Sequence, residues 1–229
     1  MDIPILYEDN HLLIVKKPVN VPVQGDESGD KDLLTLLKED IKKRYNKPGN
    51  VFLALVHRLD RPVGGVIVFA KTSKAASRLS DLIRKNEFEK KYLTIVRGKP
   101  KEEKARLIDY LVKNRKENIV NVANENTPHA KKAILEYELI GHKNDLSLLQ
   151  VNLITGRPHQ IRVQFASRGN PIYGDQKYGA KVNQHGQQIA LWSYGLAFKH
   201  PTKDETIKIL SEPPNEYPWN LWKKGTNRR

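Results

Sequence analysis

Short runs of apolar residues, some continuous as at 66–70 and some alternating with polar residues as at 133–140 and 146–153, occur along most of the chain and predict β-strands. They cover residues 5–7, 12–15, 66–70, 92–96, 133–140, 146–153, 189–198 and 206–210. The two runs around position 143 are separated by Gly-His-Lys-Asn-Asp, which is typical of a hairpin turn. The stretch 99–128 is rich in Lys, Glu and Asn, so we expect exposed strands and loops there.

Helical spacing of apolar residues occurs in only a few places. Leucines from position 33 onward predict a helix over 32–45 with Asp32 as a possible cap. Ser73 is expected to cap a helix over 73–86, and Pro158 suits the first turn of a helix over 158–168. Because strands do not alternate regularly with helices, a Rossmann or TIM-barrel fold is excluded. The pattern predicts an α+β fold with a mostly antiparallel sheet.

Composition narrows the class of protein. The 229 residues suit one large domain or two small ones, and they include no cysteine. Disulfides, thiolate metal sites and a cysteine nucleophile are therefore excluded. No apolar run approaches the roughly 20 residues that span a bilayer, and the N-terminus is acidic where a signal peptide would be basic. We expect a cytoplasmic protein that does not bind membranes.

The chain carries a large excess of positive charge. It has 40 Lys and Arg against 26 Asp and Glu, a net charge of +14, although residues 1–30 alone carry a net charge of −4. Positive charge is concentrated at 84–106, with nine bases and four acids, and at the end of the chain in Lys223, Lys224, Arg228 and Arg229. A solvated basic surface is one explanation. A polyanionic partner, nucleic acid above all, is the other.

The densest group of chemically active side chains is His57-Arg58-Leu59-Asp60, followed by Arg61 and by Gly64-Gly65. Nearby positive charge favours the ionised form of Asp60, and an oriented carboxylate can act as a nucleophile or a base. A surface salt bridge in a loop would use the same residues, so this stretch alone leaves both interpretations open.

A second group is Thr155-Gly156-Arg157-Pro158-His159-Gln160-Ile161-Arg162. A turn that leads into a helix start can bind anions through free backbone N–H groups, but a capped helix with a basic face fits equally well. The glycine-bounded turn at 171–179 is taken as structural. Tyr92, by itself, is more typical of a core residue than of a catalytic one.

The order and spacing of these groups is more specific than any one of them. His-Arg-Leu-Asp, then Lys-Lys-Tyr about 30 residues later, then the Thr155–Arg162 group and Pro-Ile-Tyr-Gly-Asp-Gln-Lys-Tyr-Gly resemble the RluA-type RNA pseudouridine synthases. The resemblance extends from Ile5 to about Pro214 and includes Lys17-Pro18. It implies a mixed, mostly antiparallel central sheet, an RNA cleft, and isomerisation of uridine to pseudouridine without a cofactor or metal.

Site residues follow from the resemblance. It implies Asp60 as the catalytic nucleophile, Tyr92 against the target base, and Arg162 as the ion-pair partner of Asp60. Candidate RNA-binding residues are Arg58, Arg61, Arg157, His159 and Lys71. The catalytic domain is expected over 1–215, without an S4-like domain, and a basic tail over 216–229. The partner would be ribosomal or transfer RNA, and the protein a monomer.

The chain departs from the usual family pattern close to the aspartate. Arg61-Pro62-Val63-Gly64 stands where a Thr-Ser pair is common, so the hydroxyl groups of that pair must be replaced by other donors. Because the target base lies inside a stack of bases, the resemblance implies base flipping. We expect Arg58 to fill the gap or to form a simple salt bridge. The motifs do not specify which uridine is modified.

Two other classes of protein would share some of these features. A non-catalytic RNA-binding module would use the charge but would not need Asp60, Tyr92 and Arg162 together. A metal-dependent nuclease would need converging carboxylates or histidines, and the seven histidines show no ligand spacing. The synthase is the interpretation that uses all the motifs.

Overall fold

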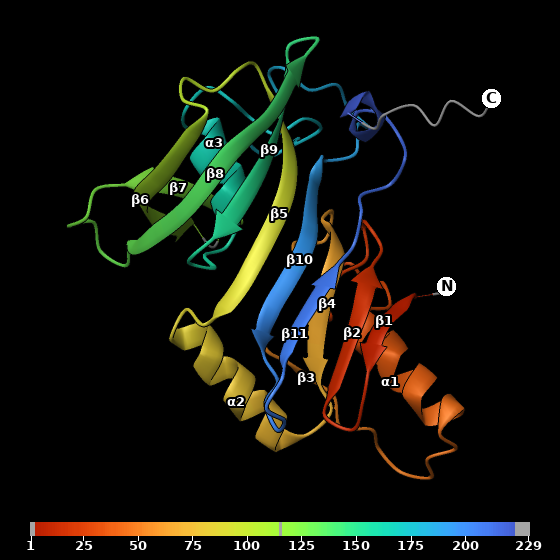
Figure 1. Ribbon diagram of the computed structural model, residues 1–229. Helices are drawn as coiled ribbons and strands as arrows, with labels where there is room; N and C mark the ends of the chain where they lie inside the picture. The colour runs from red at the N-terminus through yellow and green to blue at the C-terminus, as the bar shows by residue number, and fades with distance from the viewer. Residues whose placement is uncertain (1–2, 115, 223–229) are drawn as a thin grey trace. The chain divides into compact units, whose positions relative to one another are not determined.

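The computed structural model describes residues 3–114 and 116–222 (Figure 1). The four basic residues at the end of the predicted tail, Lys223, Lys224, Arg228 and Arg229, lie outside the described residues. The chain divides into two compact units. Unit 1 contains Met1–Lys90 and Ser193–Glu212, and unit 2 contains Lys91–Trp192 and Pro213–Arg229.

Unit 1 is built on an antiparallel arrangement of short apolar strands. Its strands are β1 (Ile5–Glu8), β2 (Leu12–Lys17), β3 (Ala54–Leu55), β4 (Gly64–Ala70), β10 (Leu191–Lys199, in this unit from Ser193) and β11 (Thr206–Leu210). The order is β1-β2-β4-β10, while β3 pairs with the end of β4 and β11 with β10. All seven residues of β4 are buried, which explains its continuous apolar sequence.

Two helices complete unit 1. Helix α1 (Leu33–Arg44) is capped by Asp32, whose side chain accepts from the Thr35 backbone N–H, as the sequence predicts. Helix α2 (Ser73–Arg84) is capped by Thr72 and not by Ser73, because the Thr72 hydroxyl accepts from the Ala75 N–H. Its apolar side packs on alternate residues of β2 and β4 in one core cluster.

The second residue of β4, Gly65, is required to be glycine by packing in unit 1. Gly65 has a φ of +113°, and a Cβ atom there would lie 2.2 Å from the Ser193 carbonyl oxygen. The Ser193 hydroxyl in turn donates to the Val66 carbonyl at 2.8 Å. Only glycine lets β4 and β10 approach this closely at the point where the Asp60 loop ends.

Unit 2 contains a five-stranded antiparallel arrangement. Its strands, in spatial order, are β5 (Phe88–Arg97, in this unit from Lys91), β9 (Leu146–Leu153), β8 (Lys131–Lys143), β6 (Lys104–Asn114) and β7 (Ile119–Ala123). The β8–β9 hairpin is tighter than predicted. Its strands run up to a two-residue turn, Asn144-Asp145, in which both residues have positive φ, as two-residue hairpins require.

Helix α3 (Gln160–Ala166) packs on one face of this sheet (Figure 1). The Phe165 ring meets the Tyr137 ring edge-on at 5.4 Å, and Val163 joins the cluster of Ala133. The helix is shorter than the predicted 158–168, because His159 has a left-handed φ of 51° that helical backbone does not allow. A short 3-10 helix, Trp219–Trp222, was not predicted.

The predicted α+β class is confirmed: each unit is a largely antiparallel sheet with few helices. Within the described residues, no helix is both long and apolar enough to cross a membrane.

Candidate active site

Asp60 lies in unit 1, in the loop that joins β3 to β4. Its carbonyl accepts from the Val63 N–H at 2.9 Å, which closes a tight turn over Arg61-Pro62. Leu59 and Val63 are buried and hold both sides of this turn in the core, while Asp60 itself is partly exposed. The turn therefore presents a carboxylate from a fixed backbone.

Beneath this turn lies a buried cation. Lys17, at the end of β2, is fully buried, and its Nζ donates to the carbonyls of Pro18 at 2.9 Å and Arg61 at 3.0 Å. Burial lowers the pKa of Lys17 to about 7, while the negative charge of Asp60 acts in the opposite direction. An ammonium group here fixes the loop that carries Asp60. The sequence interpretation included Lys17 only as part of the resemblance.

His57 anchors the start of the same loop. Its ring Nε2 accepts from the Val68 N–H at 3.2 Å, and the ring lies 5.7 Å from that of Phe88. Burial, with the charge of Lys90 as a second cause, lowers the pKa of His57 to about 3. His57 therefore stays neutral at physiological pH and acts as a structural acceptor.

The two arginines beside Asp60 have different surroundings. Arg58 is exposed. Arg61 forms ion pairs with Asp30 and, at 3.5 Å, with Asp26, and it donates to the Ser28 hydroxyl at 2.8 Å. An acidic loop of the same unit thus already neutralises part of the charge of Arg61.

Lys71 lies at the opposite end of β4 from the Asp60 turn, roughly 20 Å away at the rise of a strand. Its ammonium pairs with Glu8 at 2.7 Å and donates to the Asp9 carbonyl at 2.6 Å. Its predicted role in RNA binding stays a prediction, and in this structure the side chain ties β4 to the β1–β2 turn.

Tyr92 and Arg162 belong to unit 2 and lie on the same side of its sheet. Tyr92 is 6% exposed and pairs in register with Val151, which also pairs with Tyr137. Residues directly opposite each other in antiparallel strands share a face. Since Phe165 of α3 packs on Tyr137, α3 covers the face that carries Tyr92, and Arg162 comes from that helix.

Arg162 is held by a buried carboxylate from the glycine-bounded turn. Its Nε and Nη2 donate to Oδ2 and Oδ1 of Asp175, both at 2.8 Å, and the two side chains are 7% and 0% exposed. The guanidinium also lies over the Tyr178 ring, 5.2 Å from its centre. The pairing of Arg162 with Asp60, which the resemblance implies, stays a prediction.

The backbone of the turn that contains Asp175 is held in place by close packing and by hydrogen bonds. Gly174 has a φ of +75°, and a Cβ atom there would lie 2.2 Å from the Gln188 carbonyl oxygen. Asp175 Oδ1 also accepts from the N–H groups of Lys177 at 2.9 Å and Tyr178 at 3.2 Å. Sequence reasoning took this turn as structural and missed Asp175. The available signal was its place beside two tyrosines in a motif of the resemblance.

The start of α3 makes several contacts within the protein, and its role in binding anions stays a prediction beside the alternative of a capped helix. The helix has only seven residues, and the Arg157 N–H already donates to Gln160 Oε1 at 3.0 Å. The Arg157 side chain donates to the Lys132 carbonyl at 2.9 Å. His159 Nδ1 lies 2.7 Å from the Tyr178 hydroxyl, so His159 supports the ring that Arg162 packs against.

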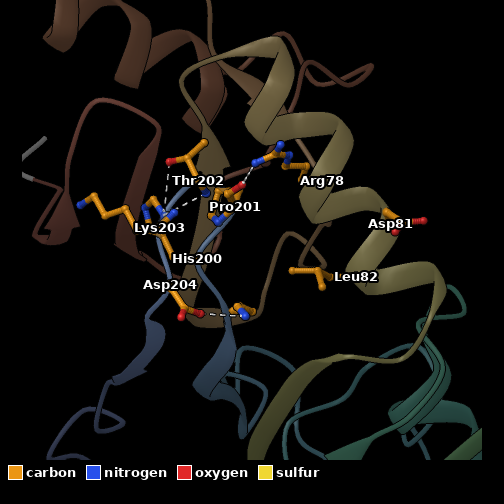
Figure 2. Close-up of a pocket in the computed structure, with 9 residues that line it drawn as sticks. Arg78, Asp81, Leu82, His200, Pro201, Thr202, Lys203 and Asp204 are labelled. Carbon is orange, nitrogen blue, oxygen red and sulfur yellow. Dashed lines mark hydrogen bonds and ion pairs between the residues drawn. The ribbon is translucent and has the colours of Figure 1, made fainter.

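A separate hollow in unit 1 lies between α2 and the turn that joins β10 to β11 (Figure 2). The charges around it are paired within the protein, as with Lys199 and Asp204 at 2.9 Å. Arg78 donates to the Pro201 carbonyl at its edge. Buried His200 accepts from the Lys203 N–H at 3.0 Å and meets Asp9 at 3.0 Å. We attribute this cluster to holding the turn.

Two further observations concern the classes considered above. Among the described residues, no group of three or more His, Asp or Glu side chains is arranged to hold a metal ion. A family model described as RNA pseudouridylate synthase matches residues 11–167. The chain belongs to this family. The match covers more than half of the chain and includes Asp60, Tyr92 and Arg162.

Curated relatives agree with this family. Over 211 residues the chain is 32% identical to ribosomal large subunit pseudouridine synthase C of Vibrio parahaemolyticus. The aligned region covers 90% of this chain and 64% of the Vibrio protein. The chain is also 33% identical over 231 residues to an uncharacterized RNA pseudouridine synthase of Aquifex aeolicus. This aligned region covers 94% of this chain and 71% of the Aquifex protein. The resemblance to RluA-type synthases is thereby confirmed. The chain spans about 64% of the length of the first of these relatives.

Solved structures share the fold. Human RNA pseudouridylate synthase domain containing 4 has a TM-score of 0.79 at 21% identity, with 95% of this chain and 91% of that chain covered. Human RNA pseudouridylate synthase domain containing 1 has a TM-score of 0.74 at 21% identity, with 93% and 84% covered. At these identities the likeness concerns the fold alone.

Proposed function

We propose that this protein is an RNA pseudouridine synthase, an isomerase that converts specific uridines in structured RNA to pseudouridine through Asp60. The observation that carries the proposal is the family match over 11–167, which contains the three residues that the resemblance makes catalytic. The rigid turn that presents Asp60 above the buried Lys17 supports it, since a nucleophilic carboxylate must be both ionised and oriented.

The proposed reaction is an isomerisation, so every atom of the uridine is retained. Asp60 attacks the ribose or assists cleavage of the bond from C1′ to N1 of uracil. The detached uracil turns and rejoins through C5, forming the C1′–C5 bond, and the proton on C5 then leaves while N1 gains one. The proposed route uses no cofactor.

Tyr92 and Arg162 take the supporting roles in this proposal. Tyr92 stacks against the flipped uracil, a contact worth about 1–3 kcal/mol for a base on an aromatic ring. Arg162 pairs with the nucleophilic carboxylate, and Asp175 keeps the guanidinium in place. Flipping itself costs a few kcal/mol, which contacts to the RNA backbone offset.

The RNA partner is bound mainly through basic side chains. Of the predicted set, Arg58 is exposed and suited to contact RNA, while Arg61, Arg157, His159 and Lys71 also make contacts within the protein. Between ribosomal and transfer RNA, the names of relatives such as the Vibrio protein favour ribosomal RNA. A cytoplasmic monomer is part of the same proposal.

The test is pseudouridine mapping on RNA from a strain that lacks the gene. We expect the purified wild-type protein to modify a small set of uridines and Asp60→Asn to modify none while still binding RNA. Asp204→Asn is the matched control, because Asp204 is 94% exposed and lies in the β10–β11 turn.

Two outcomes would contradict the proposal at different levels. Normal pseudouridine formation by Asp60→Asn would overturn the aspartate mechanism and leave the activity standing. A wild-type protein that binds RNA but modifies none of it would favour the non-catalytic binding module.

A further inference from the structure

Arg162 has a second neighbour besides its carboxylate, the ring of Tyr178. The guanidinium carbon lies over this ring, 5.2 Å from its centre. The half-buried ring also packs on the apolar cluster that contains Val163 of the same helix. Asp175 holds the guanidinium in another way, through two hydrogen bonds to Nε and Nη2 along one edge. The position of the guanidinium is therefore set by an ion pair and by a ring contact together.

The hydroxyl of Tyr178 fixes the ring in turn. Its oxygen accepts from the Val120 N–H at 2.8 Å and lies 2.7 Å from His159 Nδ1. Val120 is a buried residue of β7, and His159 is the left-handed residue just before α3. The ring of His159 also meets the Tyr178 ring edge-on at 5.7 Å. Tyr178 is thus attached both to a strand of unit 2 and to the start of the helix that carries Arg162.

These contacts bear on the reaction because of the role proposed for Arg162. A guanidinium that pairs with the nucleophilic carboxylate must keep a fixed direction as well as a fixed charge. Two hydrogen bonds along one edge still allow a planar group to pivot about that edge, whereas contact with an aromatic ring restricts the pivot and adds cation–π attraction. A shift of about 1 Å in a group that orients the reactants can lower a rate by about 100-fold.

We propose that Tyr178 is a positioning residue, whose ring holds the Arg162 guanidinium in the direction that the reaction requires while its hydroxyl holds the ring. This proposal rests on the proposed function, because it takes the role of Arg162 from it. It assigns different consequences to the two parts of one side chain. The ring affects the rate of the reaction, and the hydroxyl affects the stability of the fold.

The experiment compares Tyr178→Phe and Tyr178→Leu with the wild type. Phenylalanine keeps the ring and removes the hydroxyl, whereas leucine removes both and remains apolar. Tyr110→Phe is the matched control, because it makes the same change on β6 of the same unit, where the hydroxyl donates to Glu125 at the surface. The substrate is total RNA, tritiated at C5 of uracil, from a strain that lacks the gene. Since the proposed reaction loses the C5 hydrogen, release of tritium gives kcat and KM, measured below the melting temperature of every variant.

Both Tyr178 variants should melt below the wild type, because the buried Val120 N–H loses its acceptor in each. Tyr178→Phe should nevertheless keep most of the wild-type kcat. Tyr178→Leu should lower kcat by about 100-fold with KM unchanged, since the guanidinium loses its direction and RNA binding does not involve Tyr178. Phenylalanine would then rescue the rate without rescuing the melting temperature, which a purely structural role of Tyr178 does not produce. Tyr110→Phe should change neither kcat nor KM.

Three results would overturn the proposal. Wild-type kcat in a folded Tyr178→Leu protein would show that Arg162 does not need the ring. If Tyr178→Phe lost as much kcat as Tyr178→Leu, the ring would not be the part of the side chain that matters. A rise in KM with unchanged kcat would assign Tyr178 to RNA binding. If the wild type itself released no tritium, the proposed function would fail, and the wild-type measurement separates that case from the other three.

Discussion

Each unit buries a basic side chain that belongs to the proposed site, Lys17 in unit 1 and Arg162 in unit 2, but the two units compensate these charges differently. In unit 2, Arg162 meets a full negative charge in Asp175, in a bidentate pair with both side chains almost completely buried. In unit 1, the ammonium of Lys17 below the Asp60 turn donates to the carbonyls of Pro18 and Arg61, which are its hydrogen-bond acceptors among residues 3–114 and 116–222.

The difference has a consequence for how each charge responds to its environment. A bidentate Arg–carboxylate pair is fixed in geometry and in charge, since guanidinium does not lose its proton in proteins. Backbone carbonyls stabilise the charged form of a lysine less than a paired carboxylate does. Burial therefore lowers the pKa of Lys17 to about 7. Unit 2 thus holds a permanent charge, and unit 1 holds one that depends on pH.

The largest expected effect comes from breaking the pair in unit 2. Asp175→Ala leaves the Arg162 guanidinium buried without its bidentate partner, which destabilises a protein by about 3–5 kcal/mol. We expect urea unfolding to show a loss of this size together with loss of pseudouridine formation. Asp204→Ala, at an exposed side chain, should change neither.

A double variant tests whether the uncompensated charge of Arg162 causes the loss of stability in Asp175→Ala. Arg162→Met with Asp175→Leu removes both charges and fills the space with apolar atoms, so it should be more stable than Asp175→Ala. The Lys177 and Tyr178 N–H groups lose their Asp175 acceptor in both variants, so that loss cancels in the comparison. The double variant should remain inactive, because Arg162 is absent. If the double variant were less stable than Asp175→Ala, the pair would matter for its shape and not for its charge balance.

An intermediate effect is expected from the lysine of unit 1, and it should depend on pH. Burial lowers the pKa of Lys17 from 10.5 to about 7, so between these values the unfolded chain holds more protons than the folded one. The contribution of Lys17 to the free energy of unfolding therefore increases as the pH rises above 7, and it does not change with pH below 7. The cost of the buried charge is fully present at low pH.

Lys17→Met removes this dependence and so isolates it. The free energy of unfolding of the wild type minus that of Lys17→Met should increase by about 3 kcal/mol between roughly pH 7 and pH 9.5. Urea titrations at several pH values measure this difference. A difference that stays constant over that range would show that Lys17 keeps its ordinary pKa in the folded protein.

Much of the fold could be predicted because it depends on local periodicity. The strand over residues 206–210 and the helix capped by Asp32 were predicted to within a residue. Some of the predicted helix ends were wrong because the conformation or side chain of a single residue sets where a helix begins. His159 takes a left-handed φ and delays α3, and Thr72 caps α2 one residue before Ser73. The two-residue strand β3 has too few residues to show a period.

Site residues could be predicted where one continuous motif contains them. They could not be predicted where a residue acquires its role through contact with a segment distant in the sequence. The Asp60 loop and Arg162 stand out as charged groups in their own stretches of sequence. Asp175 does not, since its role arises only when the turn folds back on α3, 13 residues away along the chain. Lys16 and Lys17 are adjacent lysines at the end of one strand, yet only Lys17 is fully buried, and burial of that kind is set by tertiary packing.

The smallest effect, and the sharpest contrast with Arg162, is expected from Arg61, a partly exposed arginine of unit 1. Arg61 pairs with Asp30 and Asp26 in water, where such pairs contribute little to stability. Arg61→Ala should therefore leave the urea midpoint unchanged, unlike Asp175→Ala. It should also weaken poly(U) binding less than Arg58→Ala, because the acidic loop already neutralises part of the Arg61 charge. Salt-dependent binding of the two variants decides this, and a larger loss for Arg61→Ala would mean that RNA displaces the acidic loop from Arg61.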